Sequence, residues 1–293
     1  MRVGRSAVVS HTGRKRRHNE DAYVCAPPLF AIADGMGGAR AGEVASNLAA
    51  AALQTGDVDG GGQERVGALI QAANQSVYER SSRDAEVAGM GTTMTVALVE
   101  GAIITFGHVG DSRAYVLRDG TLEQLTDDHS LVAELVRGGK LSAEEAEHHP
   151  QRSVITRALG TDPDVDVDTF TVEARNGDVF VLCSDGLTDM VGDAEIGEVL
   201  GEPRESLREA AEDLVRRANR AGGQDNITVI AFEMTDEPEP DEQTLEQTVE
   251  QTQPMAAVDA ESKKRRAWRR FVPLLILLIA IAAAAVALWV LAR

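Results

Sequence analysis

Acidic residues stand at the ends of several apolar, strand-like stretches that lie far apart in this chain. Asp34, Asp111 and Asp185 each follow such a stretch, and Asp225 comes just before one. Glycine or asparagine adjoins each of the four, which allows a sharp turn of the backbone there. One Asp-Gly pair is an ordinary turn signal, but the recurrence of the pattern indicates that these carboxylates share a site.

Carboxylates gathered in one place repel one another unless cations neutralise them. Glu20 and Asp21, at the start of another strand-like stretch, add to the group. Oxygen ligands favour Mg²⁺ or Mn²⁺, whereas Zn²⁺ would favour His or Cys. Two such ions that share a carboxylate lower the pKa of a bound water and make hydroxide available at neutral pH. The acidic pattern therefore predicts a two-metal site.

The composition limits the class of protein and its partners. The chain has 293 residues, of which 43% are hydrophobic, and this suffices for one sizeable domain with appendages. A net charge of −18 argues against binding to nucleic acid. Cys25 and Cys183 lie inside apolar, strand-like stretches, so we expect buried, reduced thiols in a cytosolic setting rather than a disulfide.

The C-terminal region carries the pattern of a membrane anchor. Residues 271–292 contain no charged side chain, and a helix of that length reaches about 33 Å, enough to cross a bilayer core. Six basic residues lie within 263–270, and Trp268 and Trp289 lie near the two ends of the apolar stretch. The positive-inside rule places everything before the span in the cytoplasm. A buried core helix is the alternative. We expect no signal peptide before the N-terminal soluble domain and no extracellular domain after the span.

Between the soluble domain and the span lies an acidic, polar stretch, residues 236–262, for which we expect disorder. Its Glu-Gln-Thr triplet occurs three times, at 242–244, 246–248 and 250–252. A tether is the favoured interpretation and a kinase-acceptor segment is the alternative. The predicted organisation is a catalytic domain at 1–235, a disordered linker at 236–262, a basic juxtamembrane segment at 263–270 and a transmembrane helix at 271–292.

Hydrophobic periodicity predicts a domain of antiparallel sheets covered by helices. Alternating or short apolar stretches predict strands at 6–9, 22–26, 29–33, 94–98, 103–109, 114–117, 121–125, 167–172, 179–183 and 228–233. Apolar residues at helical spacing predict helices at 44–53, 66–77 and 207–218. Arg118-Asp119-Gly120 reads as a hairpin turn.

Seven motifs in order carry a resemblance to a known family. They are RRHNED, ADGMGG, GHVGDSRAY, LTDDHS, HPQRSVITRALG, LCSDGLTDM and GGQDNITVI. Over residues 3–234 the chain resembles the metal-dependent serine/threonine phosphatases of the protein phosphatase 2C (PPM) family in their bacterial form. The resemblance implies an α+β fold, a four-layer α-β-β-α sandwich of two antiparallel sheets flanked by helices, with the metal pair at one edge.

The resemblance also implies roles for the acidic residues. Asp34 would bridge two Mn²⁺ or Mg²⁺ ions, the carbonyl of Gly35 would join one, and Asp185 and Asp225 would hold the other. Asp111, together with Asp185, matches the position of a third, weaker metal in bacterial members.

The resemblance implies that three further residues contact metal-bound water or the substrate phosphate. Glu20 and Asp21 would act through metal-bound waters, and Arg16 matches the phosphate-binding arginine. A hydroxide between the ions would attack phosphorus in line, without a covalent phosphoenzyme.

The group that protonates the leaving alcohol is left open. Met36 stands where many eukaryotic relatives have the histidine proposed as the acid. His18 and His108 are candidates by their place in the sequence, although a structural role is favoured for each.

The expected substrates are phosphoproteins. Residues 131–160 resemble the flap beside the active site of bacterial members, which shapes substrate choice. Membrane-bound bacterial serine/threonine kinases and their targets are the partners suggested by analogy. The alternatives are a catalytically inactive relative that binds phosphoproteins and a two-metal hydrolase of small phosphoesters or nucleic acid.

Overall fold

The computed structural model describes residues 1–37, 41–56, 60–203 and 205–237. These belong to one compact unit, Met1–Glu237. Most of the predicted linker, the basic segment and the predicted transmembrane helix lie outside the described residues. Within the described ranges, no helix is both long enough and apolar enough to cross a membrane.

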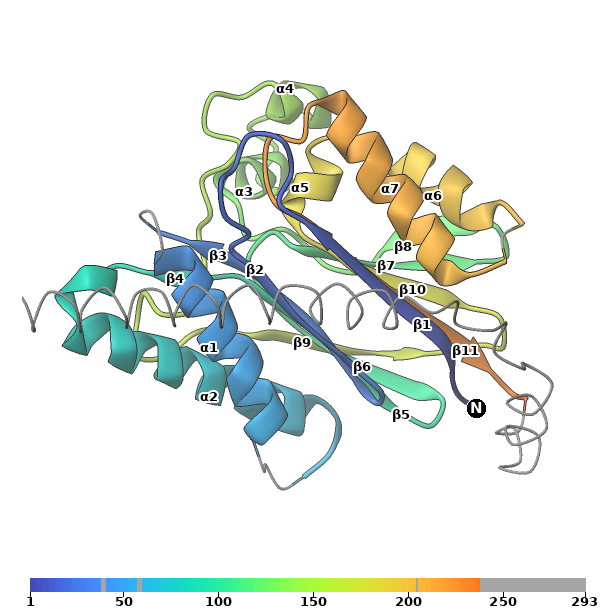
Figure 1. Cartoon of the computed structure of the whole chain (residues 1–293), viewed down its shortest axis with the longest axis horizontal. Helices are drawn as coiled ribbons and strands as arrows, with labels where there is room; N and C mark the ends of the chain where they lie inside the picture. Colours follow the sequence, from blue (N-terminus) through green and yellow to red (C-terminus); the bar gives the residue numbers. More distant parts are fainter. Residues whose placement is uncertain (38–40, 57–59, 204, 238–293) are drawn as a thin grey trace, which may run out of the picture. The chain divides into compact units, whose positions relative to one another are not determined.

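Two antiparallel sheets form the centre of this unit (Figure 1). In the first, the strand order is β1 (Arg2–His11), β11 (Ile227–Thr235), β10 (Val179–Cys183), β7 (Arg113–Arg118) and β8 (Thr121–Gln124). In the second, the order is β2 (Asp21–Ala26), β3 (Leu29–Met36), β5 (Met94–Glu100), β6 (Ile103–Val109) and β9 (Asp168–Glu173), and the short β4 (Gly91–Thr92) pairs with β3.

Alternation along the strands separates the inner layer of the core from the outer layers. In β3, Phe30 and Ile32 face the other sheet, whereas Ala31 and Ala33 face the helices on the outside. Phe30 stacks on Phe232 of β11 with ring centroids 4.2 Å apart. Aromatic contacts of this kind hold the two sheets together.

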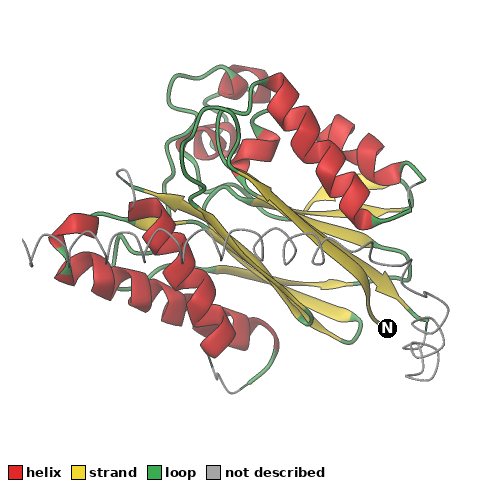
Figure 2. Ribbon diagram, in the orientation of Figure 1, coloured by secondary structure: helices red, strands yellow, loops and turns green. Residues whose placement is uncertain are grey.

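Helices cover both outer faces of the sheet pair (Figure 2). The helices α1 (Ala41–Thr55) and α2 (Gly62–Arg83) pack on the second sheet. The first sheet is covered by α5 (Asp185–Thr188), α6 (Asp193–Gly201) and α7 (Leu207–Ala221). Two further short helices, α3 (Leu131–Arg137) and α4 (Ala143–Glu147), belong to the predicted excursion. The layer order is the predicted α-β-β-α sandwich.

Several local predictions need correction. The strand at 29–33 continues to Met36 because Gly35 and Met36 pair with β4, so Asp34 lies inside a strand rather than at its end. Helices α3, α5 and α6 were not predicted. The excursion at 131–160 returns to the core before its predicted end, because Leu159 is fully buried and pairs with Thr92.

Other details match the prediction. The β7–β8 turn has Asp119 and Gly120 at positive φ, as a tight hairpin requires. Both cysteines are free thiols; Cys183 is fully buried in β10 as predicted, whereas Cys25 in β2 is only partly buried. Burial raises the pKa of both thiols, to about 12 for Cys183, so neither is a ready nucleophile.

Candidate active site

Two of the predicted acids face each other across one strand pair. In the register of β2 and β3, Asp21 lies directly opposite Asp34. The backbone of Asp34 is fixed by β4 and the residue that follows it. The Asp34 N–H donates to the Thr93 hydroxyl at 3.0 Å, and the Asp34 carbonyl accepts from the Thr92 hydroxyl at 2.8 Å. The position of this carboxylate is therefore set by strand pairing rather than by a flexible turn.

The fold brings the other predicted aspartates to the same place. Asp185 begins α5 directly after β10, and Asp111 follows β6. Burial raises the pKa of Asp34 well above its usual range, and the charges of Asp21, Asp185, Asp111 and Asp225 raise this pKa further. Burial, with Asp111 and Asp225 next, likewise raises the pKa of Asp185. Carboxylates from distant parts of the chain thus repel one another at one site.

Two oxygens of this cluster are buried without a partner. Asp21 Oδ1 and Asp185 Oδ1 make no hydrogen bond to any described residue. In the described part of the chain, the acids do not enclose a common point as they stand, because no group of three His, Cys, Asp or Glu side chains is arranged to hold a metal ion. The donor set is nevertheless all oxygen, and unpartnered buried carboxylate oxygens are costly. This chemistry fits a hard divalent cation.

Asp21 is held by hydroxyl groups that the sequence interpretation overlooked. Its Oδ2 accepts hydrogen bonds from Thr228 Oγ1 at 2.6 Å and Ser184 Oγ at 2.9 Å. Thr228 is bonded in turn to Ser10 at 2.8 Å. Burial raises the pKa of Asp21 to about 6, although these two hydroxyls oppose the shift. They fix one oxygen of Asp21 and leave the other to face the cluster.

The loop after β1 brings a cation to the cluster. Arg16 forms an ion pair with Asp225 at 2.7 Å and approaches Glu20 at 3.8 Å, and about half of its side chain is exposed. Burial raises the pKa of Glu20, and Arg16 opposes this shift. The structure thus places Arg16, Glu20 and Asp225 together.

Asn226 connects the loop to the start of β11. Its Oδ1 accepts from the Glu20 N–H at 2.7 Å, and its Nδ2 donates to the carbonyls of Thr12 and His18, both at 2.9 Å. The Glu20 carbonyl accepts from the Gly35 N–H at 3.2 Å, which places Gly35 beside the same loop. The motif QDN contains Asn226, yet only its neighbour Asp225 was identified from the sequence.

His108 has a structural environment. It is buried, and its ring nitrogens contact the Thr95 hydroxyl at 2.9 Å and the Asp127 carbonyl at 3.2 Å. Burial, followed by the charge of His129, lowers the pKa of His108 to about 4. A ring that stays neutral in this way is a poor proton donor at neutral pH.

His129 supports the turn before Asp111 and was also overlooked. Its ring Nδ1 accepts from the Gly110 N–H at 3.0 Å, and its backbone N–H donates to the Gly110 carbonyl at 2.7 Å. Its ring Nε2 lies 3.1 Å from the Asp168 carboxylate. Gly110 has a φ of +114° and packs against Thr93, so only glycine fits this turn. His129 therefore positions Asp111 through the backbone.

A helix-covered sandwich with carboxylates gathered at neighbouring strands is the architecture of a metal-dependent phosphohydrolase. The family model described as Protein phosphatase 2C matches residues 10–229. The chain belongs to the protein phosphatase 2C family.

Named relatives are bacterial. The chain is 44% identical over 237 residues to the serine/threonine protein phosphatase PstP of Mycobacterium tuberculosis, in a match that covers 80% of this chain and 46% of PstP. It therefore spans about half the length of that relative. It is 40% identical over 237 residues to the serine/threonine phosphatase stp of Listeria innocua, covering 75% of this chain and 92% of the relative.

A solved structure has the same fold. The crystal structure of the PstP catalytic domain in complex with two manganese ions superposes with a TM-score of 0.74 at 40% identity, covering 80% of this chain and all of that one. The resemblance inferred from the seven motifs is thereby confirmed at the level of the family.

Proposed function

We propose that this chain is a phosphoprotein phosphatase that hydrolyses phosphoserine and phosphothreonine with the help of divalent metal ions. The main supporting observation is the convergence of Asp21, Asp34 and Asp185, where two buried carboxylate oxygens have no hydrogen-bond partner in the described part of the chain. The named relatives are serine/threonine phosphatases, and a relative's catalytic domain binds two manganese ions. Together these support the enzyme class.

The residues present fit a pair of Mn²⁺ or Mg²⁺ ions. Asp34 and the Gly35 carbonyl would hold the first ion, and Asp34, Asp185 and Asp225 the second. Glu20 and Asp21 would act through water, and Asp111 with Asp185 would hold a third ion. When bound, the ions supply a water of lowered pKa and neutralise charge on the phosphoryl oxygens.

The chain's own residues account for the remaining requirements of the reaction. Arg16, exposed beside the cluster, would exchange its ion pair with Asp225 for a substrate phosphate, which a guanidinium binds through paired N–H donors. Thr228 and Ser184 keep Asp21 in place. The lowered pKa of His108 keeps its ring neutral and a poor proton donor at neutral pH, so protonation of the leaving alcohol falls to another group.

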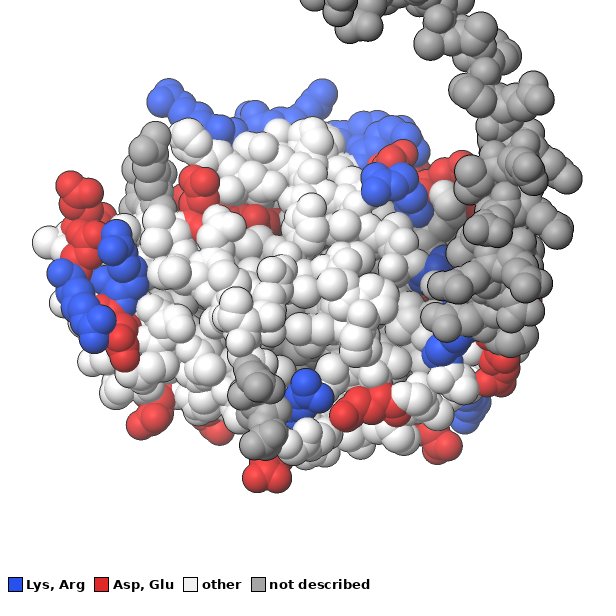
Figure 3. Space-filling view, turned by 60° about the horizontal axis from the view of Figure 1, so that its bottom comes forward, with Lys and Arg blue, Asp and Glu red and all other residues white. Residues whose placement is uncertain are grey.

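Protein substrates suit the surface better than nucleic acid does. The face in Figure 3 carries Lys and Arg along its top and, mixed with Asp and Glu, at its other edges, around a largely uncharged middle. Nucleic acid requires clustered basic side chains that displace counterions.

Membrane anchoring is the second part of the proposal. The uncharged stretch at 271–292 and the basic residues at 263–270 support a single-pass anchor in the cell membrane with a cytoplasmic catalytic domain. Membrane-bound serine/threonine kinases and their targets are then natural partners. Fractionation of cells that express the full chain, compared with a chain ending at residue 262, tests the anchor. Equal amounts of both in the soluble fraction would contradict it.

The activity is tested by phosphate release from phosphothreonine peptides with and without Mn²⁺. We expect Mn²⁺-dependent release that exceeds the rate on nucleotides. Binding of the same peptides without any turnover would instead favour the inactive, phosphoprotein-binding alternative.

A further inference from the structure

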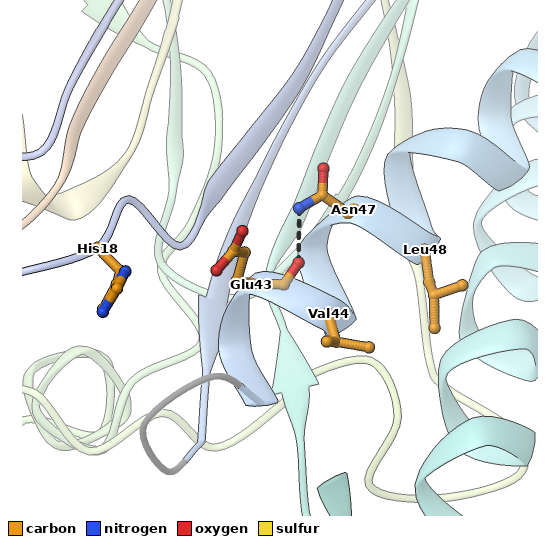
Figure 4. A pocket seen from close by; sticks show the side chains of 5 residues that line it. All are labelled: His18, Glu43, Val44, Asn47 and Leu48. Carbon is orange, nitrogen blue, oxygen red and sulfur yellow. Dashed lines mark hydrogen bonds between the residues drawn. The ribbon is translucent and has the colours of Figure 1, made fainter. Parts of the chain in front are cut away.

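An open pocket of about 680 Å³ adjoins the candidate active site. Figure 4 shows its wall, which consists of His18 from the loop before β2 and four residues of α1. The lining residues are His18, Glu43, Val44, Asn47 and Leu48. Nothing in the proposed hydrolysis uses any of them.

The pocket lies next to the catalytic carboxylates. Glu20 Oε2 is so close to the first turn of α1 that a Cβ on Gly42, the residue before Glu43, would lie 2.9 Å from it. The backbone carbonyl of His18 also accepts a hydrogen bond from the side-chain amide of Asn226, and the oxygen of the same amide accepts from the Glu20 N–H. A peptide with its phosphate at the cluster would therefore pass this pocket with a neighbouring residue.

The chemistry of the wall favours a basic side chain. Glu43 is partly buried, and no Lys or Arg among the described residues forms an ion pair with it. Val44 and Leu48 are partly exposed and pack on the core from the same helix. An aliphatic stem could lie along these two apolar residues while its cationic end meets the carboxylate, as Lys and Arg do at protein surfaces.

We propose that this pocket binds a lysine or arginine side chain of the substrate, close in sequence to the phosphorylated residue. Glu43 is the residue that determines this preference. The inference rests on the proposed function, because it assigns a substrate subsite beside the same catalytic cluster. The proposed occupant of the pocket is a cationic side chain. A preference for an acidic or an apolar side chain would overturn the proposal.

The test uses phosphothreonine peptides that differ in one residue. Lysine is placed in turn at each of the three positions on either side of phosphothreonine, and each peptide is compared with its norleucine and glutamate counterparts. Norleucine keeps the stem and removes the charge. At one or two positions we expect kcat/KM with Mn²⁺ to be about two- to fivefold higher for lysine than for norleucine, as for a partly exposed ion pair.

Charge reversal separates a binding role from a structural one. In Glu43→Gln the ratio of lysine to norleucine should fall to about one, and in Glu43→Lys the glutamate peptide should become the better substrate. Glu64 is the matched control, because it is also an acid in the first turn of a helix, α2, but does not line the pocket. Glu64→Lys should leave the ratio unchanged. A lysine preference that persists in Glu43→Lys, or no preference at any position, overturns the inference.

A binding measurement keeps this test independent of turnover. The same peptides, with a non-hydrolysable phosphonate in place of the phosphate, are titrated against the protein in Mn²⁺. The lysine peptide should bind about two- to fivefold more tightly than the norleucine peptide in the natural protein, and the two should bind equally in Glu43→Gln. If no peptide is hydrolysed but this ratio holds, the proposed function fails and the pocket assignment stands. Equal binding in the natural protein overturns the pocket assignment.

Discussion

Gly35 and Gly42 lie so close together that neither position has room for a methyl group. A Cβ on Gly42 would lie 2.6 Å from the Gly35 carbonyl oxygen and 2.9 Å from Glu20 Oε2, and a Cβ on Gly35 would overlap the Gly42 carbonyl. Strand β3, which carries the proposed metal ligands, and the first turn of α1 therefore meet backbone to backbone. The sequence suggests that Gly35 allows a turn of the backbone. In the structure Gly35 lies inside β3, where its lack of a side chain allows the backbone of Gly42 to come close.

Replacing Gly42 with alanine should therefore damage both the fold and the site. We expect Gly42→Ala to lower the free energy of unfolding by about 1–3 kcal/mol, because an overpacked methyl must displace backbone. Mn²⁺ affinity should also fall, since Gly35 and Glu20 shift with it. Urea denaturation and calorimetric titration measure the two effects. Gly67→Ala in α2, whose Cβ has ordinary space, should be neutral or stabilising.

Asp185→Asn should abolish hydrolysis and leave the fold intact. Burial and neighbouring carboxylates raise the pKa of Asp185, so its ionisation opposes folding when no metal is bound. The metal-free variant should accordingly unfold at the same or a higher temperature than the natural protein, while the rise in Tm on adding Mn²⁺ shrinks. Thermal scans with and without Mn²⁺ measure both. The exposed Asp164→Asn should change neither, and full activity in Asp185→Asn would refute the assigned metal site.

Residue patterns were sufficient to predict antiparallel sheets covered by helices and to single out the acidic residues, because each depends on local periodicity or on a residue type. The four-layer order came from the family resemblance. The alternation in β3 identifies Ala31 and Ala33 as one face and Phe30 and Ile32 as the other. The missed helix α6 buries only Ile196 and Val199 and contains two glycines. Such a short helix has too few apolar residues to establish a 3.6-residue period.

The groups that hold the acids could not be found in this way. Thr228 bonds Asp21 across 207 positions of sequence, and in the sequence it is only another β-branched residue in a strand. His129 reaches Gly110 from just before the excursion. Partners of this kind depend on the packing of the two sheets and not on any local pattern. The span at 271–292 remains a prediction.

Thr228→Val should weaken metal binding without a large change in shape. The substitution removes the 2.6 Å hydrogen bond to Asp21, and loss of such a supporting contact costs about 10–100-fold in metal affinity or activity. Calorimetric titration with Mn²⁺ and phosphate-release kinetics measure this loss. Thr105→Val makes the same change at a buried hydroxyl that has no hydrogen-bond partner among the described residues. That variant should be as stable as the natural protein or more so, with unchanged Mn²⁺ affinity.

His108 should make the protein less stable in acid without taking part in the reaction. Its folded-state pKa of about 4 lies below the ordinary value of 6.5, so its contribution to stability is fully present above pH 6.5 and is lost as the pH falls toward 4. The unfolded chain binds the proton first, and the contribution amounts to about 3 kcal/mol. The difference in unfolding free energy between the natural protein and His108→Asn, measured in urea from pH 4 to 8, should therefore shrink as the pH falls. Because the neutral ring is bonded to Thr95 and Asp127, Mn²⁺-dependent kcat in the folded variant should persist at neutral pH. A pH-independent difference would contradict the lowered pKa of His108. A well-folded variant without activity would make His108 a catalytic group after all.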